Sequence, residues 1–326
     1  MTTLVTGAGL IGASFAEWAA KRGERVVFLD PEPRADFLRA KLGDESDYQL
    51  VRADVRDLPA IVAAIQAHKV DTVVHSAGLI GARVEASLYM GLQVNLMGTM
   101  NVAEAVRLAG VRRLVHISTF GVYDTRREIA GPLKEDFPRG GVGRGYANSK
   151  VAKELILEAY KNMYGFELVV LRPANVYGLG HFWSGSSGGE KMQALLEAGV
   201  MGVPARLRMS DTIANEYIYA KDVGRAVDLA ATAAAPKQTA FNIGNGVVDS
   251  FEQVAAAVRK LLPGLTVEVE PGDAGKSKSQ PLDISAAKAH LGWAPAYSLE
   301  AGFADYLADL RAIGPGAKAR LSGQGR

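Results

Sequence analysis

The stretch "TTLVTGAGLIG", residues 2–12, decides the fold. A β-branched, apolar run leads into Gly7, Gly9 and Gly12 in the spacing G-x-G-x-x-G, and a segment of helical period follows. In such a turn the first glycine permits the tight bend, the second lets backbone approach a bound group, and the third lets the helix pack on the sheet. Because N–H groups at a helix start attract phosphate, we predict a dinucleotide turn; a packing loop without ligand is the alternative. The predicted contacts are Gly7, Gly9, Leu10, Ile11 and Gly12.

The first half of the chain continues this alternation of strand and helix. Further strand-like runs occupy residues 25–30, 49–54, 71–77, 112–119 and 167–173. Segments of helical period lie between them, roughly at 10–22, 57–68, 86–109 and 145–164. Runs that are apolar on both faces and joined by helices indicate a parallel sheet covered on both sides. We therefore expect an α/β fold, a doubly wound parallel-sheet Rossmann domain with a smaller C-terminal α/β substrate lobe.

The rhythm changes after Pro173, where "NVYGLGHFWSGSSGG" is rich in glycine, serine and aromatic residues. Such a composition is typical of a functional loop. We predict a Rossmann domain over 1–172 with about 213–245, and a substrate lobe over 173–212 and 246–314. The polar, glycine-containing end, 315–326, is predicted to be a flexible tail.

Composition excludes several functions. The 326 residues carry 37 Lys+Arg against 35 Asp+Glu, so a net charge of +2 recruits neither nucleic acid nor an anionic membrane. No apolar run is long enough to cross a bilayer, and the N-terminus has no export signal. The absence of cysteine removes thiol catalysis and thiolate metal sites and fits a cytoplasmic protein. His75 and His116 are interpreted as core histidines, and we predict no metal site.

Acidic and small residues end several predicted strands. Asp30 ends the second strand, where a carboxylate can bind both ribose hydroxyls of NAD and repel the 2′-phosphate of NADP; a turn or cap residue before Pro31 is the alternative. We therefore predict NAD as the cofactor. Further cofactor contacts are predicted at Asp54, Val55, Ala77, Gly78, Ser118 and Pro173.

The stretch "GYANSK", residues 145–150, places Tyr146 and Lys150 on one helix face. A lysine cation about 5 Å from a phenol would favour the phenolate by roughly 3 kcal/mol, which is on the order of two pKa units. Tyr146 could then exchange a proton near neutral pH, and Lys150 could also hold the nicotinamide ribose, so both are predicted cofactor contacts. A lone Y-x-x-x-K is usually a solvated pair, but Ser118 and Thr119 add hydroxyls at the carboxyl end of the fifth strand. This set indicates hydride transfer at an alcohol or ketone.

Ordered blocks extend this pattern over residues 2 to about 310, among them "TGAGLIG", "ADVRD", "HISTFGVYD", "YANSK", "LRPANVYG" and "EYIYAKDVGRA". With them the chain resembles the extended short-chain dehydrogenases, the NAD-dependent epimerase/dehydratase family. The resemblance implies that Thr119, Tyr146 and Lys150 are catalytic. It implies that Asn95 supports the cofactor site, with a surface amide as the alternative. It also implies a homodimer through the helices near 89–109 and 146–164.

Two departures from the family pattern bear on the reaction. Phe120 and Gly121 follow Thr119 where the dehydratases carry acids, so elimination of water is disfavoured. The glycine turn is also one residue shorter than the G-x-x-G-x-x-G usual in this branch.

Two further departures concern the substrate. Asn215 and Glu216 stand where nucleotide-sugar enzymes carry an arginine, and Glu268 and Glu270 stand near the usual second arginine. Carboxylates in place of a cation clamp disfavour a diphosphate. The alternative is that charge comes from another direction, and the candidates are Arg206, Arg208 and Lys191.

The sequence thus predicts an NAD-dependent oxidoreductase that acts on a sugar-like or other small substrate without a nucleoside diphosphate. The alternatives are a nucleotide-sugar epimerase and a non-catalytic NAD(H)-sensing protein. Aromatic residues of the loop after Pro173 would suit a ring face of the substrate, or else pack on one another. The predicted substrate contacts are Gly78, Thr119, Phe120, Tyr146, Asn175, Phe182, Trp183 and Arg208.

Overall fold

The structure is a computed structural model that describes residues 1–43, 48–141, 143–180, 187–234, 237–274 and 279–314. Its centre is a seven-stranded sheet in the order β10-β6-β5-β4-β1-β2-β3, in which neighbouring strands are parallel. The strands are β1 (Thr2–Thr6), β2 (Arg25–Asp30), β3 (Tyr48–Arg52), β4 (Thr72–His75), β5 (Arg113–Ile117), β6 (Glu167–Pro173) and β10 (Ala240–Ile243). The predicted doubly wound α/β fold is confirmed.

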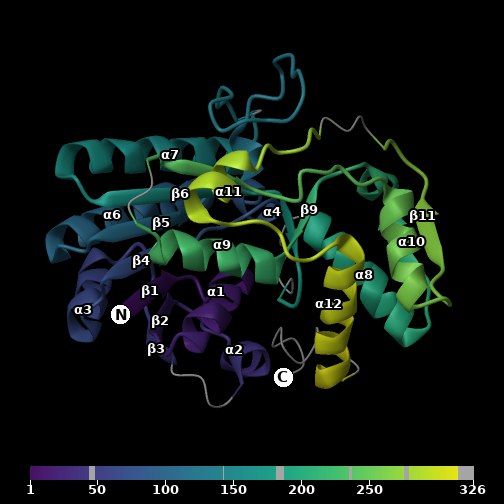
Figure 1. The fold of residues 1–326 in the computed structure, drawn as a ribbon, viewed down its shortest axis with the longest axis horizontal. Helices are drawn as coiled ribbons and strands as arrows, with labels where there is room; N and C mark the ends of the chain where they lie inside the picture. The colour runs from purple at the N-terminus through teal and green to yellow at the C-terminus, as the bar shows by residue number, and fades with distance from the viewer. Residues whose placement is uncertain (44–47, 142, 181–186, 235–236, 275–278, 315–326) are drawn as a thin grey trace.

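Helices cover both faces of this sheet, as Figure 1 shows. Successive residues of a strand point into different cores, as Leu4 packs in one hydrophobic cluster and Val5 in the other. This explains why the strands are apolar on both faces. One cluster contains residues of α3 (Leu58–His68), α6 (Gly98–Ala109) and α7 (Gly145–Tyr164), and the other contains residues of α1 (Leu10–Lys21) and α9 (Ala220–Thr232).

Short elements connect these layers. Asp57 caps α3 by accepting a hydrogen bond from the Ala60 N–H at 3.0 Å, as expected for an aspartate just before a helix. The remaining helices around the sheet are α2 (Ala35–Leu42), α4 (Ala82–Glu85), α5 (Leu88–Leu92), a π-helical turn (Gln93–Met97), a 3₁₀ turn (Phe120–Val122) and α11 (Ser285–Leu291), whereas α12 (Leu299–Ile313) packs with β9 (Tyr217–Tyr219) and the helices of the C-terminal half.

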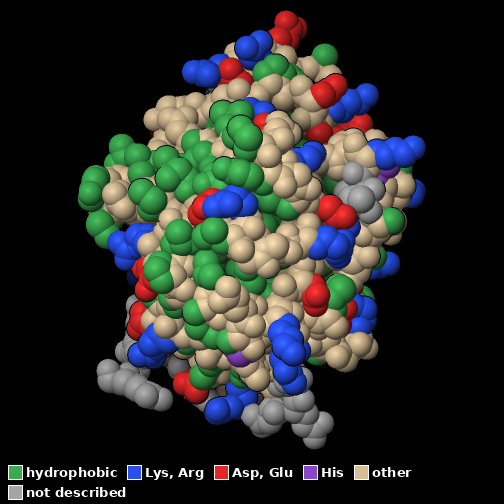
Figure 2. Space-filling view, turned by 90° about the vertical axis from the view of Figure 1, so that its left-hand side faces the viewer, with side chains coloured by type: hydrophobic (Ala, Val, Ile, Leu, Met, Phe, Trp, Pro, Cys, Tyr) green, Lys and Arg blue, Asp and Glu red, His purple; other side chains and the backbone are tan. Residues whose placement is uncertain are grey.

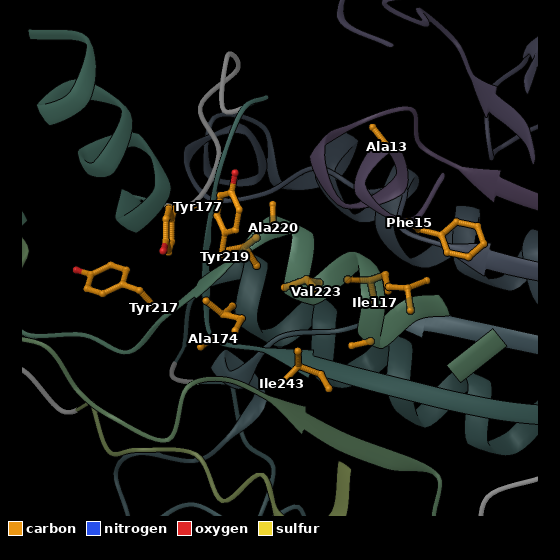
Figure 3. Close-up of a cluster of buried hydrophobic side chains, with 14 of the residues drawn as sticks. Ala13, Phe15, Ile117, Ala174, Tyr177, Tyr217, Tyr219, Ala220, Val223 and Ile243 are labelled. Atoms are coloured by element: carbon orange, nitrogen blue, oxygen red, sulfur yellow. The ribbon is translucent and has the colours of Figure 1, made fainter. Parts of the chain in front are cut away.

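The C-terminal half adds two small parallel sheets. One pairs β7 (Asn175–Tyr177) with β9 (Tyr217–Tyr219), and the other pairs β8 (Ala205–Arg208) with β11 (Val267–Glu270). Helices α8 (Ser187–Met201) and α10 (Phe251–Leu261) lie beside β11, at the right of Figure 1 and away from the strands β1–β5. A cluster of tyrosines, Tyr177, Tyr217 and Tyr219, belongs to the same core as Phe15 and Ile117 of the main sheet region (Figure 3).

The division into two domains stays a prediction; the chain forms β8 and β9 in the small sheets and then returns to the main sheet at β10. The predicted tail, 315–326, lies outside the described residues. Across the described ranges, no helix combines the length and apolar character needed to cross a membrane.

Candidate active site

The glycine turn between β1 and α1 assigns a different task to each glycine. Gly7 has φ +90° and its N–H bonds the Leu29 carbonyl at 2.9 Å, so a left-handed residue starts the turn. A Cβ on Gly12 would lie 2.7 Å from the Gly7 oxygen, so this position must stay small for α1 to pack. A Cβ on Gly9 would meet nothing within 4 Å, and Gly9 begins α1 without a side-chain cap. The turn therefore presents uncapped N–H groups beside open space, as a pyrophosphate cradle requires.

Asp30 lies next to this cradle, at the end of β2. One carboxylate oxygen accepts the Ala8 N–H at 2.9 Å and the other accepts the Glu32 N–H at 2.8 Å. A carboxylate oxygen can accept more than one hydrogen bond, so ribose hydroxyls can still bind there. The chain thus supplies both parts of a site that fits an NAD molecule, a phosphate cradle and a ribose acceptor.

Three further residues predicted to bind the cofactor, Asp54, Val55 and Ala77, have different surroundings. The Asp54 carboxylate bonds Arg56, whose hydrogen bonds lower the pKa of Asp54. The Val55 side chain is buried against Gly98 of α6, so only its backbone remains for a ligand. Ala77 lies directly beside Gly7, since a Cβ on that glycine would come within 3.1 Å of the Ala77 backbone. The contacts of Asp54, Val55, Ala77, Gly78 and Pro173 with the cofactor stay predictions.

Asn95 is a buried brace. Its Oδ1 accepts the Leu79 N–H at 2.8 Å, and its Nδ2 donates to the Leu79 carbonyl and the Ser149 hydroxyl, both at 3.0 Å. The side chain is fully buried inside the π-helical turn, so the surface-amide alternative is wrong. Asn95 joins the loop after β4 to α7, and its direct contact with the cofactor stays a prediction.

The structure brings together the three residues predicted to be catalytic. Thr119 follows β5, and its side chain hydrogen-bonds the Tyr146 phenol near the start of α7. The Lys150 Nζ donates to the Ile117 carbonyl at 2.7 Å and lies 5.8 Å from the centre of the Tyr146 ring. All three therefore lie at the carboxyl end of β5, the edge at which open α/β sheets bind ligands.

The ionisation of this set differs from the sequence-based expectation. Burial raises the pKa of Tyr146 to about 12, opposed by the hydrogen bond from Thr119. Burial also lowers the pKa of Lys150 to about 8, opposed by the charge of Glu154. The expected fall in the Tyr146 pKa is wrong for the protein alone, because it counted attraction between the charges and omitted the loss of hydration that both suffer. The effect of burial on the phenol therefore exceeds that of the Thr119 hydrogen bond.

Beneath the catalytic set lies an ionic network that the sequence did not reveal. Glu154, one turn after Lys150, is fully buried and receives the Arg172 guanidinium on both oxygens, at 3.0 and 2.7 Å. Arg172 and Arg139 hold the pKa of Glu154 below its usual range against the effect of burial. The Ser118 hydroxyl donates to Glu154 at 2.5 Å. The Ser118 side chain is therefore engaged with Glu154 of α7, and only its backbone remains for the predicted contact with the cofactor.

A second lysine, Lys153, lies on the same face of α7 and was also missed. It is fully buried, its Nζ donates to the Ala77 carbonyl at 3.1 Å, and burial together with Lys150 lowers its pKa well below the usual value. His75 and His116 are buried close by, with their rings stacked 5.4 Å apart. Their burial agrees with the interpretation as core histidines. The i, i+3 spacing of the two lysines was the available signal.

The predicted substrate residues are only partly brought together. The Asn175 amide donates to the Glu216 carbonyl at 3.1 Å, and Gly188 of α8 packs against its side chain. Phe120 is half-buried against the core. Arg208 pairs with Asp211 at 3.1 Å, with 67 % of its side chain exposed. Phe182 and Trp183 lie outside the described residues, so their predicted contacts are untested.

The carboxylates that disfavoured a diphosphate are engaged elsewhere. Glu216 is buried, and its two oxygens accept the N–H groups of Gly246 and Leu282, each at 2.7 Å; burial raises its pKa to about 7. In the β8–β11 register Glu268 stands opposite Arg206, with an ion pair at 3.2 Å. Glu270 stands opposite Arg208 in the same register. The expectation that these residues repel a diphosphate therefore loses most of its physical basis, because Glu216 is held by backbone N–H groups and Glu268 pairs with Arg206.

Fold and site together define a class, the short-chain dehydrogenases that transfer hydride with a bound dinucleotide. The model of the family "NAD dependent epimerase/dehydratase family" matches residues 3–244, and the chain belongs to this family. Its members are NAD-dependent enzymes, so the predicted enzyme class and cofactor are confirmed at this level.

Individual relatives span nearly the whole chain. A UDP-glucose 4-epimerase of Mycolicibacterium smegmatis is 33% identical over 312 residues, which are 93% of this chain and 96% of the relative. A dTDP-glucose 4,6-dehydratase of Xanthomonas campestris is 29% identical, over 93% of this chain and 91% of the relative. The crystal structure of a Thermus thermophilus UDP-glucose 4-epimerase in complex with NAD superimposes with a TM-score of 0.81 at 27% identity, covering 95% of this chain and 99% of that one. These relatives favour the alternative prediction, a nucleotide-sugar epimerase, over an enzyme whose substrate lacks a nucleoside diphosphate.

Proposed function

We propose that the protein is an NAD-dependent epimerase of a nucleotide sugar, which inverts a secondary carbinol carbon of the sugar. The observation that carries the proposal is the Thr119–Tyr146–Lys150 set at the sheet edge, in a chain similar over nearly its full length to a UDP-glucose 4-epimerase. We place this activity in the cytoplasm, as expected for a chain without cysteine.

The chemistry assigned to the chain is a proton transfer coupled to hydride transfer. Tyr146 takes the proton of the sugar hydroxyl, while Thr119 holds that oxygen. Bound NAD would supply the hydride acceptor and donor, and an oxidised nicotinamide carries a positive charge that would favour the phenolate. Lys150 donates to the Ile117 carbonyl at the end of β5, and we assign to its positive charge the task of favouring the phenolate. Tyr146 would give the proton back to the same oxygen, and the carbon would be inverted if the hydride came back to the opposite face of the ketone.

Two features favour epimerisation over the other reactions of the family. Phe120 and Gly121 leave the position after Thr119 without the acid and base that removal of water needs. Glu216 is held by backbone N–H groups and Glu268 by Arg206, so neither carboxylate is left free to oppose a diphosphate. Both observations support a nucleotide sugar as substrate.

A thermal-shift panel with NAD present tests the substrate class. Nucleotide sugars and nucleoside diphosphates should stabilise the protein, whereas free sugars and sugar acids should not. Stabilisation by nucleotide-free compounds alone would overturn the proposal and restore a dehydrogenase of small alcohols.

We further propose a homodimer built on α5, the π-helical turn and α7. Figure 2 looks at the side on which α6 and α7 lie at the left of Figure 1, and hydrophobic side chains gather there. Contiguous apolar surface of this kind marks protein interfaces.

Light scattering should give twice the chain mass, and the double variant Leu155→Glu/Met163→Glu should be monomeric, whereas Met201→Glu on α8 should stay dimeric. A monomeric wild type would contradict the proposal. The exposed apolar side chains of α5, the π-helical turn and α7 are Leu88, Tyr89, Met90, Met97, Leu155, Met163 and Tyr164.

A further inference from the structure

Helix α8 carries a buried cation in the substrate lobe, Lys191. Its side chain is almost entirely buried, with the residue 3% exposed. The Nζ donates one hydrogen bond, to the Asp211 carbonyl at 2.7 Å. Two aromatic rings flank it, with the Nζ 5.1 Å from the centre of Tyr217 and 5.8 Å from that of Phe251. The ammonium therefore lies in a largely apolar setting.

Lys191 has no ionic partner among the described residues. Within the part of the chain that the structure describes, no carboxylate lies within ion-pair distance of its Nζ. The carboxylate of Asp211, whose carbonyl accepts from Lys191, pairs with Arg208 at 3.1 Å instead. Burial accordingly lowers the pKa of Lys191 to about 8, opposed only by the charge of Asp211. Buried charges are normally paired, so a bound anion would complete this arrangement.

The position of Lys191 relates it to the reaction site. Gly188, one turn earlier on the same face of α8, packs against the side chain of Asn175, which follows β6 at the carboxyl edge of the sheet. Tyr217, the ring next to Lys191, is the register partner of Asn175 in the β7–β9 sheet. Figure 3 shows Tyr217 at the edge of the core cluster, with its hydroxyl directed away from the other labelled side chains. Lys191 therefore lies on the part of the lobe that adjoins the end of β6.

We propose that Lys191 binds the diphosphate of the nucleotide-sugar substrate and so sets the requirement for a nucleotide. The inference rests on the proposed function and names the residue that selects its substrate class. The other basic residues considered for this task differ from Lys191, since Arg206 and Arg208 are mostly exposed and pair with Glu268 and Asp211. An ammonium shielded from water interacts more strongly with phosphate oxygens than an exposed, paired one.

The test is calorimetric titration of the NAD-loaded protein with UDP and with uridine. Lys191→Met should weaken UDP binding by about 10- to 100-fold, the loss expected for one charge-assisted contact, while uridine and NAD bind as before. Lys191→Arg should keep most of the affinity for UDP. The control Arg206→Met, which removes an exposed, paired cation, should bind UDP like the wild type.

The outcomes separate this inference from the proposed function. Equal affinity of wild type and Lys191→Met for UDP would overturn the role of Lys191 and leave the epimerase intact. A parallel loss of uridine and NAD binding in Lys191→Met would also overturn it, because the effect would be structural. A wild type that binds neither UDP nor a UDP-sugar would overturn the proposed function itself.

Discussion

Lys150 at the sheet edge and Lys191 in the lobe are physically alike. Each is buried, each donates to a backbone carbonyl at 2.7 Å, and burial lowers the pKa of each to about 8. They differ in surroundings, because Lys150 has the buried carboxylate of Glu154 one turn away, whereas Lys191 is flanked by the rings of Tyr217 and Phe251. A buried ammonium group therefore takes part in the reaction at the sheet edge and, on our proposal, selects the substrate in the lobe.

The strongest test of the sheet-edge half is Tyr146→Phe. Removing the phenol oxygen should lower turnover by about 10³-fold or more, because proton transfer loses its acid/base group. NAD affinity should stay within about twofold, since the ring and Lys150 remain. Steady-state kinetics and calorimetry measure both quantities. Retention of most activity would remove Tyr146 from the mechanism.

Crossed variants of the two lysines should separate their tasks. Lys150→Met should lower turnover about 100-fold and weaken NAD about tenfold, because it removes the charge beside Tyr146 and the anchor on Ile117. Lys191→Met should leave NAD affinity unchanged and raise KM for a nucleotide sugar instead. NAD titrations and initial rates on both variants decide this. If both variants lost NAD binding equally, the two lysines would share one role.

The burial of Lys191 also predicts how stability depends on pH. Its pKa of about 8 lies below the ordinary 10.5, so between these values the unfolded chain holds a proton that the folded chain has released. Stability should therefore rise with pH through this window, by up to about 3 kcal/mol from this group. The free energy of unfolding, measured with urea between pH 7.5 and 10, should rise less in Lys191→Met than in the wild type. Arg206→Met should follow the wild type. Tyr217, Phe251 and Asp211, which face the ammonium, are kept in both variants. Identical slopes for wild type and Lys191→Met would show that burial does not shift this lysine.

The smallest expected effect concerns the cofactor end. Asp30 should make NAD bind at least tenfold more tightly than NADP, about 1.4 kcal/mol, because its carboxylate repels a 2′-phosphate. Asp30→Ala should reduce this preference mainly by weakening NAD. Calorimetry with both dinucleotides measures the ratio. Equal affinities in the wild type would remove Asp30 from the cofactor site.

Sequence patterns predicted the parts of the molecule that depend on local spacing. The glycine turn, the strands and the Tyr146–Lys150 pair depend on residues close in the chain, and the structure has the turn, the strands and the pair where they were predicted. The lobe was misread because its partners are remote. Glu216 accepts from Leu282, and Glu268 pairs with Arg206, contacts 66 and 62 residues apart that no local motif reveals. The pKa of Tyr146 was misjudged for a related reason, since burial depends on the whole fold.

Product analysis after incubation of the NAD-loaded protein with UDP-glucose tests the central claim most directly. The anomeric proton signals in ¹H NMR should show conversion into the 4-epimer until equilibrium, without net accumulation of NADH, and Tyr146→Phe should show none. Unchanged UDP-glucose and other nucleotide sugars, together with steady formation of NADH from a nucleotide-free alcohol, would contradict the epimerase account.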